Sequence, residues 1–353
     1  MDMYIEKKVL RNLSKCYSVA PLRYKGQDCL LVAAEKKDPC LLFDIEGNYM
    51  DQIWETPGGT MTMVQIPGSD GQFLAVHQFY SPNDSAEAKI VLVTPPVQEG
   101  AKWSVRTIVD IPFVHRFDIL ERDGHKYLFA CTLKSGHDYK DDWSHPGRIY
   151  ATELPENLDS YNENNQLPMT CIKEGLGHNH GYTRDVENGV VCCIVSCDQG
   201  VFRFTPPQNP QDSWKEEQLL DEATSDAILI DLNGDGLKEM VSISPFHGDS
   251  VVIYEQKSSK YTCVYSCPTS PEFAHAICAG TLCGKPVVII GHRGGERNLL
   301  ALEHDSNGYN AVILDKDVGP ANALLFQHQG RDIILSANRE TDEIALYHIT
   351  KEK

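Results

Sequence analysis

The chain repeats one unit, two short apolar runs separated by turn residues, and this repeat constrains the fold more than any other feature. The runs are rich in Val, Ile, Leu and Phe, and the turns hold segments such as Arg122-Asp123-Gly124. Such pairs are typical of β-hairpins. They occupy residues 18–35, 59–77, 113–134, 180–197, 223–244, 273–292 and 319–338. The sequence therefore predicts an all-β protein.

A further strand-like segment follows most of these hairpins. Clear examples are residues 89–94, 148–153, 200–205, 250–255 and 298–303. Four-stranded units that recur about every 40–50 residues are typical of a β-propeller. Seven hairpins predict seven blades. The alternative is a pair of β-sandwiches, but no segment in the middle of the chain resembles a linker.

The two ends of the chain support a closed ring. The last unit, residues 319–349, supplies only three strands, and residues 4–10 form a strand-like segment that belongs to no hairpin. We expect the N-terminal strand to complete the last blade, which would remove the exposed edges of the sheet. The prediction is a single propeller domain over residues 1–353, with a long insertion at about 135–175.

Charge and composition narrow the possible partners. The net charge of −18 repels phosphate, which argues against nucleic acid and anionic membranes. No apolar segment approaches the roughly 20 residues needed to cross a bilayer, and the first residues do not resemble a signal peptide. We expect a cytoplasmic protein with a small-molecule partner. The sequence gives no indication of the oligomeric state.

The 12 cysteines are better explained as buried thiols than as disulfides or metal ligands. Many fall within predicted strands, and the sequence contains no Cys-x-x-Cys pair. A thiolate zinc site or a dithiol redox centre is therefore not expected. Buried thiols agree with a reducing compartment.

Three histidines and an aspartate occupy corresponding positions of the repeat: His115, His180, Asp226 and His275. In a propeller the first strands of all blades start beside the central axis on one face. We therefore expect these side chains to meet there and to bind a divalent transition metal, with manganese, zinc or iron preferred over calcium. His178 is an alternative to His180, because alternate residues of a strand point the same way. For each histidine, a hydrogen-bonded structural role is the competing interpretation.

The second strands end on the same face and add further side chains to the predicted mouth of the channel. We expect His77 or His292 to act as the catalytic base. Arg293 or Arg339 would bind a carboxylate or an enolate oxygen, although a solvated charge at the rim is equally compatible. The remaining predicted substrate contacts at this mouth are His247, Asn322 and Asn338.

The long insertion contains a mixture of aromatic and polar residues that is typical of a loop contacting a sugar. We expect it to cover the mouth and to bring Tyr139, Trp143 and His145 to the substrate. A flexible surface loop is the alternative.

One hairpin has the residue pattern of a calcium-binding loop. Acidic or amide side chains alternate along the turn and a glutamate closes it: Asp231, Asn233, Asp235 and Glu239. This order is typical of calcium loops. A tight turn without a metal is the competing interpretation. The hairpin is expected at the end of the strands that lies far from the mouth.

Together the calcium-type hairpin, the histidines at strand starts and the sevenfold repeat resemble FG-GAP-like propellers. Within that group they resemble the propeller portion of fungal aldos-2-ulose dehydratases, which act on keto sugars. Propeller-fold oligogalacturonate lyases, which place a histidine-bound metal at the axis, are more distantly similar. Both resemblances imply an elimination reaction.

We therefore expect a metal-dependent carbon–oxygen lyase that acts on a keto sugar, a uronide or an oxidised glycoside. The reaction would be a β-elimination through a metal-stabilised enolate. Two alternatives remain open at the level of sequence. One is a non-catalytic propeller that binds a protein or carbohydrate partner, and the other is a sugar isomerase or hydrolase that uses the same metal site.

Overall fold

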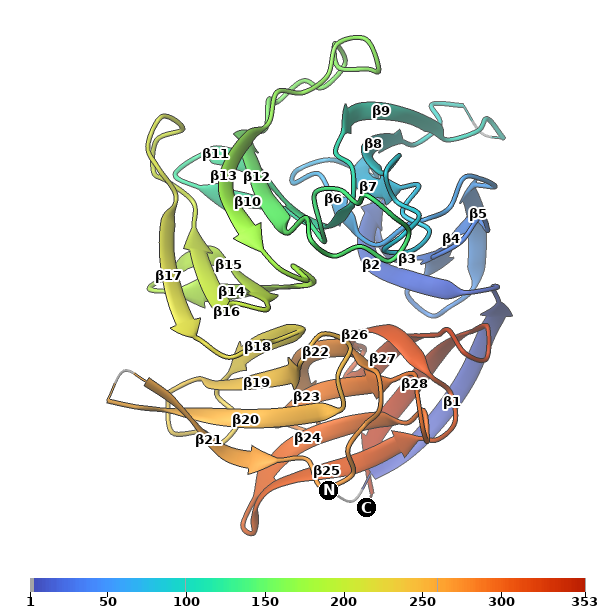
Figure 1. Cartoon of the computed structure of the whole chain (residues 1–353). Helices are drawn as coiled ribbons and strands as arrows, with labels where there is room; N and C mark the ends of the chain where they lie inside the picture. Colours follow the sequence, from blue (N-terminus) through green and yellow to red (C-terminus); the bar gives the residue numbers. More distant parts are fainter. Residues whose placement is uncertain (1–2, 99, 259, 353) are drawn as a thin grey trace.

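A computed structural model describes residues 3–98, 100–258 and 260–352 of the chain. These residues form seven antiparallel sheets of four strands each, arranged in a ring (Figure 1). The structure confirms the predicted all-β, seven-bladed propeller. Among the described residues, no helix is long and apolar enough to cross a membrane.

The blades follow one another along the chain. Blade 1 consists of β2 (Cys16–Tyr24), β3 (Gln27–Ala34), β4 (Cys40–Asp44) and β5 (Tyr49–Trp54). Blade 2 consists of β6 (Met63–Gln65), β7 (Phe73–His77), β8 (Lys89–Thr94) and β9 (Ser104–Asp110). Blade 3 consists of β10 (Val114–Arg122), β11 (His125–Thr132), β12 (Gly147–Glu153) and β13 (Thr170–Leu176). Blades 4 and 5 consist of β14 (Gly181–Glu187), β15 (Val190–Cys197), β16 (Gly200–Thr205) and β17 (Lys215–Leu220), then β18 (Asp226–Ile230), β19 (Glu239–Ser244), β20 (Ser250–Lys257) and β21 (Lys260–Ser266). Blade 6 consists of β22 (Ala274–Leu282), β23 (Lys285–His292), β24 (Leu299–Asp305) and β25 (Gly308–Asp315).

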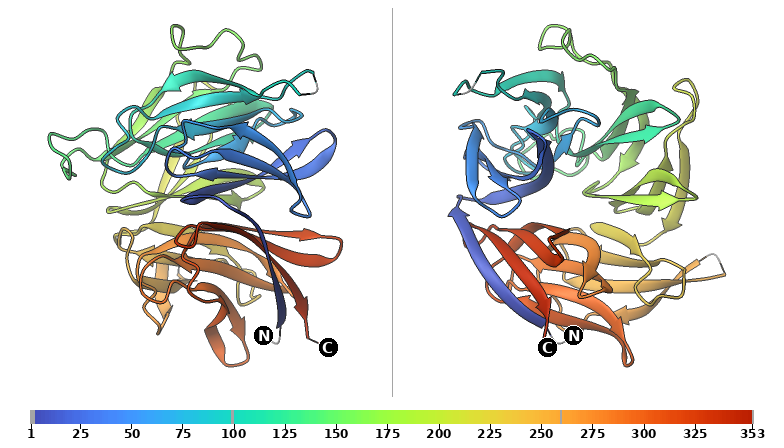
Figure 2. Two further views of the ribbon diagram at one scale, coloured as in Figure 1. Left: turned by 90° about the vertical axis from the view of Figure 1, so that its right-hand side faces the viewer. Right: turned by 180° about the vertical axis from the view of Figure 1, so that it is seen from behind.

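The N-terminal strand closes the ring, as predicted. Blade 7 consists of β26 (Pro320–His328), β27 (Arg331–Asn338), β28 (Glu343–Lys351) and the N-terminal strand β1 (Met3–Asn12). β1 pairs antiparallel with β28 along its length, so that Tyr4 lies opposite Thr350. Figures 1 and 2 show the blue β1 beside the red C-terminal strands, with the two ends of the chain close together. Every blade thus has four strands.

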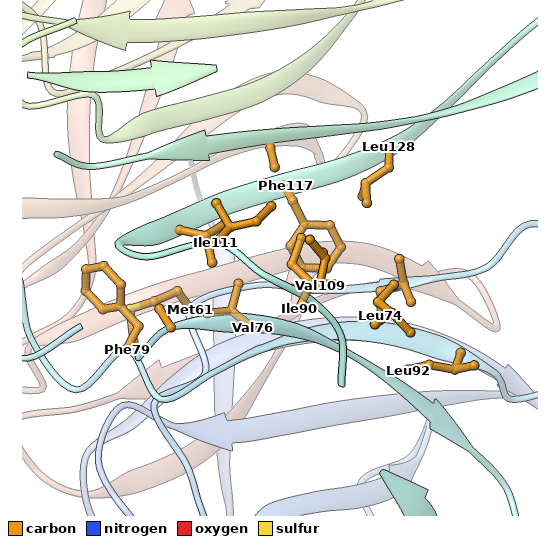
Figure 3. Packing of buried hydrophobic residues seen from close by; sticks show 14 of the residues in the cluster. Met61, Leu74, Val76, Phe79, Ile90, Leu92, Val109, Ile111, Phe117 and Leu128 are labelled. Atoms are coloured by element: carbon orange, nitrogen blue, oxygen red, sulfur yellow. The ribbon is translucent and has the colours of Figure 1, made fainter. Parts of the chain in front are cut away.

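The hydrophobic core lies between neighbouring blades. The contact between blades 2 and 3 is typical: Leu74, Val76 and Ile90 of blade 2 pack with Phe117 and Leu128 of blade 3 (Figure 3). All five side chains are at most 1 % exposed. Burying a side chain of this size stabilises the fold by about 1.5–3 kcal/mol, and the alternating apolar residues of each strand supply both of its faces.

The insertion at 135–175 is the outer half of blade 3 together with two loops. It contains β12 and most of β13, and its second loop lies along β9 of blade 2. Arg106 of β9 donates hydrogen bonds to the carbonyls of Leu158 (3.2 Å) and Tyr161 (2.8 Å). The second loop therefore covers the edge of blade 2 and is not a lid over the axis.

Two faces of the ring matter for the site. Each first strand starts on one face, which we call the histidine face. Each first strand turns into the second strand on the opposite face, which we call the turn face.

Candidate metal centre

A repeated backbone feature positions the side chains at the axis. In six of the seven blades, a residue with positive φ stands two positions before the residue that starts the first strand at the axis. The pairs are Lys15 and Tyr17, Gly59 and Met61, Phe113 and His115, His178 and His180, Phe273 and His275, and Gly319 and Ala321. Positive φ is uncommon for residues other than glycine and rare for a bulky one. Its recurrence before six axial residues shows that the turns entering these six blades are built in the same way.

A β-bulge then turns the axial side chain out of the sheet. The register of the first two strands shifts at Tyr17, His115, His275 and Ala321, so that each of these residues lies outside the ladder. Bulges redirect a side chain in this way. The axial residues of blades 1, 3 and 6 consequently reach the same point.

The predicted histidines do meet at the axis, and a tyrosine that we did not predict joins them. Tyr17 Oη lies 3.0 Å from His275 Nε2 and 3.5 Å from His115 Nε2. The rings of His115 and His180 are 4.6 Å apart between centroids. All four side chains are at most 2 % exposed. Tyr17 is at the same repeat position as the histidines, and aligning the residue before the apolar run at Ser18 would have found it.

Three of these imidazoles are held by the same kind of hydrogen bond. Nδ1 of His180 lies 2.8 Å from Asp226 Oδ2, Nδ1 of His275 lies 2.7 Å from the carbonyl of Ala321, and Nδ1 of His115 lies 3.3 Å from the carbonyl of His180. With Nδ1 donating, the lone pair of each imidazole is on Nε2. Proteins orient metal-binding histidines in this manner. Asp226 therefore lies behind His180 as an orienting carboxylate.

His247 completes a set of three possible metal ligands. Its Nε2 lies 3.3 Å from His180 Nε2, and the ligand atoms of His180, His247 and His275 all lie within 4.8 Å of one another. We predicted His247 only as a substrate contact. It stands in the loop after β19, where no periodic pattern shows which residue it faces.

Burial favours the neutral form of three imidazoles in this group. It lowers the pKa of His115 and of His275 well below the ordinary value, and it also lowers the pKa of His247. Burial raises the pKa of Tyr17 to about 12. Neutral imidazole is the form that binds a metal, so the group is suited to a divalent cation.

Aromatic side chains cover the histidine face, and one of them, Trp143, belongs to the insertion that we expected over the mouth. Phe246 stacks on His247 with 3.9 Å between centroids and on His178 with 4.6 Å. Trp143 lies 4.3 Å from His178, again between centroids. The Nδ1 of His178 lies 2.6 Å from Asp198 Oδ2. Trp143, His178 and Phe246 thus form a cluster that we call the aromatic cap. His178 belongs to this cap and does not replace His180 at the axis.

A buried lysine holds the loop that carries Trp143. Lys134 is 0 % exposed, and its Nζ donates to Asn83 Oδ1 (2.8 Å) and to the carbonyl of Asp142 (3.1 Å). The ammonium also lies 4.9 Å from the centroid of the Trp143 ring. A cation so close to an aromatic face stabilises both groups, and the first loop of the insertion is anchored over the histidine face.

A cavity of about 600 Å³ lies along the axis on the other side of the histidines. Asp226, His275 and Asn322 line it at the histidine end, and Asp118 and Arg184 line it further along the first strands. The Arg184 side chain is 52 % exposed, so this axial chamber opens toward the turn face. Asn322 is one residue beyond the axial position, which Ala321 occupies.

The last residues of the second strands β7 and β23, His77 and His292, do not face the axis, so neither can act there as the predicted base. His292 Nδ1 donates to the carbonyl of Gly294 and its Nε2 accepts from the Asn298 amide, both at 3.0 Å, which leaves neither nitrogen free. His77 packs against Trp54 with 4.5 Å between centroids and lines a separate pocket. A second strand is one strand removed from the axis, and its side chains face the neighbouring blades.

The predicted arginines at the rim are already paired. Arg293 Nε donates to Glu340 Oε1 at 2.9 Å, and Arg339 Nη1 donates to the same oxygen at 2.7 Å. Arg339 also forms an ion pair with Glu35. This network of ion pairs connects blades 1, 6 and 7. Because both guanidinium groups are used in it, the prediction that Arg293 or Arg339 binds substrate is wrong.

Three other predicted contacts also lie away from the axial chamber. Asn338 is buried within blade 7, where its Nδ2 donates to Tyr347 Oη at 3.0 Å. Tyr139 is 67 % exposed on the first loop of the insertion. His145 Nε2 on the same loop lies 3.2 Å from Asp138 Oδ1 and forms a second close group with that residue and Asp142.

The calcium-type hairpin joins β18 to β19 on the turn face, at the end of the strands that we expected. Its oxygens accept hydrogen bonds from the backbone of the loop itself. Asp231 accepts from the amides of Gly234 (2.8 Å) and Gly236 (3.0 Å), and Glu239 accepts from the Leu232 amide at 2.6 Å. Asn233 Oδ1 and Asp235 Oδ1 each accept from the amide two residues later, at 2.8 Å. These contacts account for the loop as a self-bonded turn.

His77 yields a prediction about stability. Burial lowers its pKa to about 3, with Lys89 as a lesser cause. Between pH 6.5 and pH 3 the unfolded chain therefore binds a proton at this residue that the folded chain does not. Acid should reduce the free energy of unfolding by about 1.4 kcal/mol per pH unit through this residue. We expect His77→Leu to make the acid loss shallower by that amount, measured by urea unfolding at several pH values.

The buried Val76 of the same strand provides the matched control, because Val76→Ala should lower stability at every pH without changing the slope. His77→Leu should also keep bound metal and any turnover, since His77 lies outside the axial group. Equal slopes in wild type and His77→Leu would contradict the assignment.

Comparison with known proteins shows the fold and does not show a family. No family model matches the sequence, and no curated protein matches it. Among solved structures, a streptogramin B lyase matches with a TM-score of 0.57 at 13 % identity, over 99 % of this chain and 98 % of that chain. Selenomethionine-substituted virginiamycin B lyase from Staphylococcus aureus matches with a TM-score of 0.58 at 13 % identity, over 99 % of each chain.

A third solved structure has a different description. The β-propeller domain of Cps50 (Swd1) from Myceliophteria thermophila matches with a TM-score of 0.58 at 9 % identity, over 99 % of this chain and all of that one. The same fold thus occurs in proteins named as lyases and in one named only as a propeller domain. Since a shared fold does not fix function, the function must be argued from the axial site.

Proposed function

We propose that this protein is a metal-dependent carbon–oxygen lyase that acts on a keto sugar, a uronide or an oxidised glycoside by β-elimination. The observation that carries the proposal is the convergence of buried imidazoles from several blades on one point, with Nδ1 of His115, His180 and His275 held by acceptors. A purely structural histidine does not need its Nε2 to face two others. This convergence supports a divalent metal, and imidazole ligands fit manganese, zinc or iron.

His180, His247 and His275 would hold the metal. When bound there, the metal would supply Lewis-acid chemistry, which lowers the energy of negative charge developing on a carbonyl oxygen. The axial chamber would hold the substrate, because it reaches His275 and its size is in the range of small-molecule sites. The aromatic cap would keep water from entering through the histidine face.

We assign proton transfer to His115 and Tyr17, because His77 and His292 do not reach the axis. His115 Nε2 would accept the proton from the carbon next to the carbonyl. Tyr17 Oη would donate a proton to the oxygen that leaves the neighbouring carbon, which releases water or an alcohol and an α,β-unsaturated carbonyl product. The two groups are 3.5 Å apart, so the proton taken by His115 can return to Tyr17 and the protein ends unchanged.

The position of the Asp231–Glu239 hairpin on the turn face of blade 5 supports kinship with FG-GAP-like propellers, including the propeller portion of aldos-2-ulose dehydratases. We infer a cytoplasmic location as well, because the 12 cysteines are free thiols and most of them are buried. The charge of −18 favours a small-molecule partner over nucleic acid or anionic membranes.

A substrate screen tests the proposed reaction. Protein loaded with manganese or zinc should convert at least one member of a panel of keto sugars, uronides and glycosides. The conjugated product would be followed by ultraviolet absorbance and identified by mass spectrometry. A chelator should stop the reaction and added metal should restore it. A metal-loaded protein that changes no member of the panel would remove the lyase proposal in favour of a binding propeller.

A further inference from the structure

One cation in the axial chamber has no carboxylate partner. Arg116 lines the chamber, and its Nη1 donates a 2.9 Å hydrogen bond to the carbonyl of Met61 in blade 2. Within residues 3–98, 100–258 and 260–352, no ion pair to Arg116 is formed. The other arginine of the chamber, Arg184, is paired with Asp118. The guanidinium of Arg116 therefore keeps donors and an uncompensated charge inside a confined space.

The two acidic side chains of the chamber are hydrogen-bonded to other residues and do not pair with Arg116. Asp118 accepts from Arg184 and, at 2.7 Å, from Tyr182 Oη. Asp226 Oδ2 lies 2.8 Å from Nδ1 of His180. An anion that enters the chamber thus meets one cation that is still available, and a guanidinium recognises a carboxylate through two parallel hydrogen bonds.

The same bulge that directs His115 to the axis places Arg116 in the chamber. Register is lost between Val114 and Arg116, and the pairing resumes with Arg116 opposite Cys131. His115 then faces Tyr17 while the next side chain lines the cavity. An acid bound by Arg116 consequently lies beside the candidate metal centre.

We propose that Arg116 is the anion-binding residue of the axial chamber, and that the ligand is a small polyhydroxylated carboxylate that enters from the turn face. The chamber supplies acceptors for sugar hydroxyls at Thr62 Oγ1, Thr183 Oγ1 and Asn322 Oδ1. The donors of these three side chains are bonded to backbone carbonyls, which holds the acceptor oxygens in place. Its volume of about 600 Å³ suits a sugar acid. The inference rests on the proposed function for the reaction that follows, but carboxylate binding itself requires neither metal nor turnover.

Calorimetric titration with two matched sugars tests this proposal. D-Glucuronate and D-glucose differ only in the carboxylate, so their affinity ratio reports its recognition. A hydrogen bond to a charged group contributes about 1.5–3 kcal/mol, so wild type should bind glucuronate at least about tenfold more tightly than glucose. Arg116→Met should bind the two sugars equally, and so should Arg116→Gln, which keeps a polar side chain without the charge.

Arg148 on β12, which pairs with Glu174, is the matched control, since Arg148→Met removes an arginine outside the chamber and should keep the discrimination. Equal binding of the two sugars by wild type would overturn the proposal. So would retained discrimination in a folded Arg116→Gln protein. A protein that discriminates but holds no metal would keep this inference and remove the lyase proposal, and a metal-loaded protein without discrimination would do the reverse.

Discussion

His180→Ala and His275→Ala should each lose the bound metal, whereas wild type should hold about one divalent ion per chain. The two residues come from blades 4 and 6, and with His247 they supply the ligand atoms that lie within 4.8 Å of one another. Removing one imidazole leaves two ligands, which is too few for tight binding of a transition metal. Metal content after dialysis, measured by mass spectrometry, gives the result directly.

Two further variants make the metal test specific. Asp226→Asn keeps all three imidazoles but weakens the carboxylate bond to His180 Nδ1, and loss of such a partner typically costs about 10–100-fold in affinity. His125→Ala removes a half-buried histidine at the start of β11, on the turn face, and should leave the metal content at the wild-type level. If His180→Ala and His275→Ala both keep a full complement of metal, the centre is not where we place it.

The repeat was predictable from sequence because hairpins leave a local pattern. Apolar runs of strand length, interrupted by segments such as Arg122-Asp123-Gly124, depend only on nearest neighbours in the chain. The closing strand followed from counting strands at the two ends. His115, His180 and His275 also followed from topology, since the start of a first strand must lie beside the axis whatever packs around it.

The other residues of the site are positioned by three-dimensional contacts that leave no periodic pattern in the sequence. A bulge moves the axial position by one residue, which is why Ala321 stands where we expected Asn322. The ends of second strands were placed on the correct face, but the sequence does not tell which neighbour a side chain meets there. His292 is consequently bonded to its own loop, and His77 faces Trp54.

The aromatic cap also could not be predicted, because its residues are far apart in the sequence. Trp143, His178 and Phe246 come from separate loops of blades 3, 4 and 5, and their stacking closes the face that we expected the insertion to cover. Loop-to-loop packing of this kind has no signature in any one segment. Because the aromatic cap closes the histidine face, substrate would enter the axial chamber from the turn face.

The assignment of proton transfer predicts two variants with different defects. General acid–base groups contribute about 10²–10⁴-fold to a rate, so both His115→Ala and Tyr17→Phe should reduce elimination by at least about 100-fold while keeping the metal. His115→Ala should also stop exchange of the substrate α-hydrogen with deuterated water, because the base that removes this proton is gone. Tyr17→Phe should still allow the exchange, because it lacks only the hydroxyl that protonates the leaving oxygen.

The two readouts separate this assignment from a structural role. A variant that had merely loosened the axis would lose metal as well as rate, and it would not divide exchange from elimination. His292→Ala serves as the matched control, since both of its nitrogens are bonded to backbone and it should keep both activities. Wild-type elimination in either His115→Ala or Tyr17→Phe would rule out that residue as a proton carrier. Loss of metal in His115→Ala would instead make His115 a fourth ligand and leave Tyr17 as the sole proton carrier at the axis.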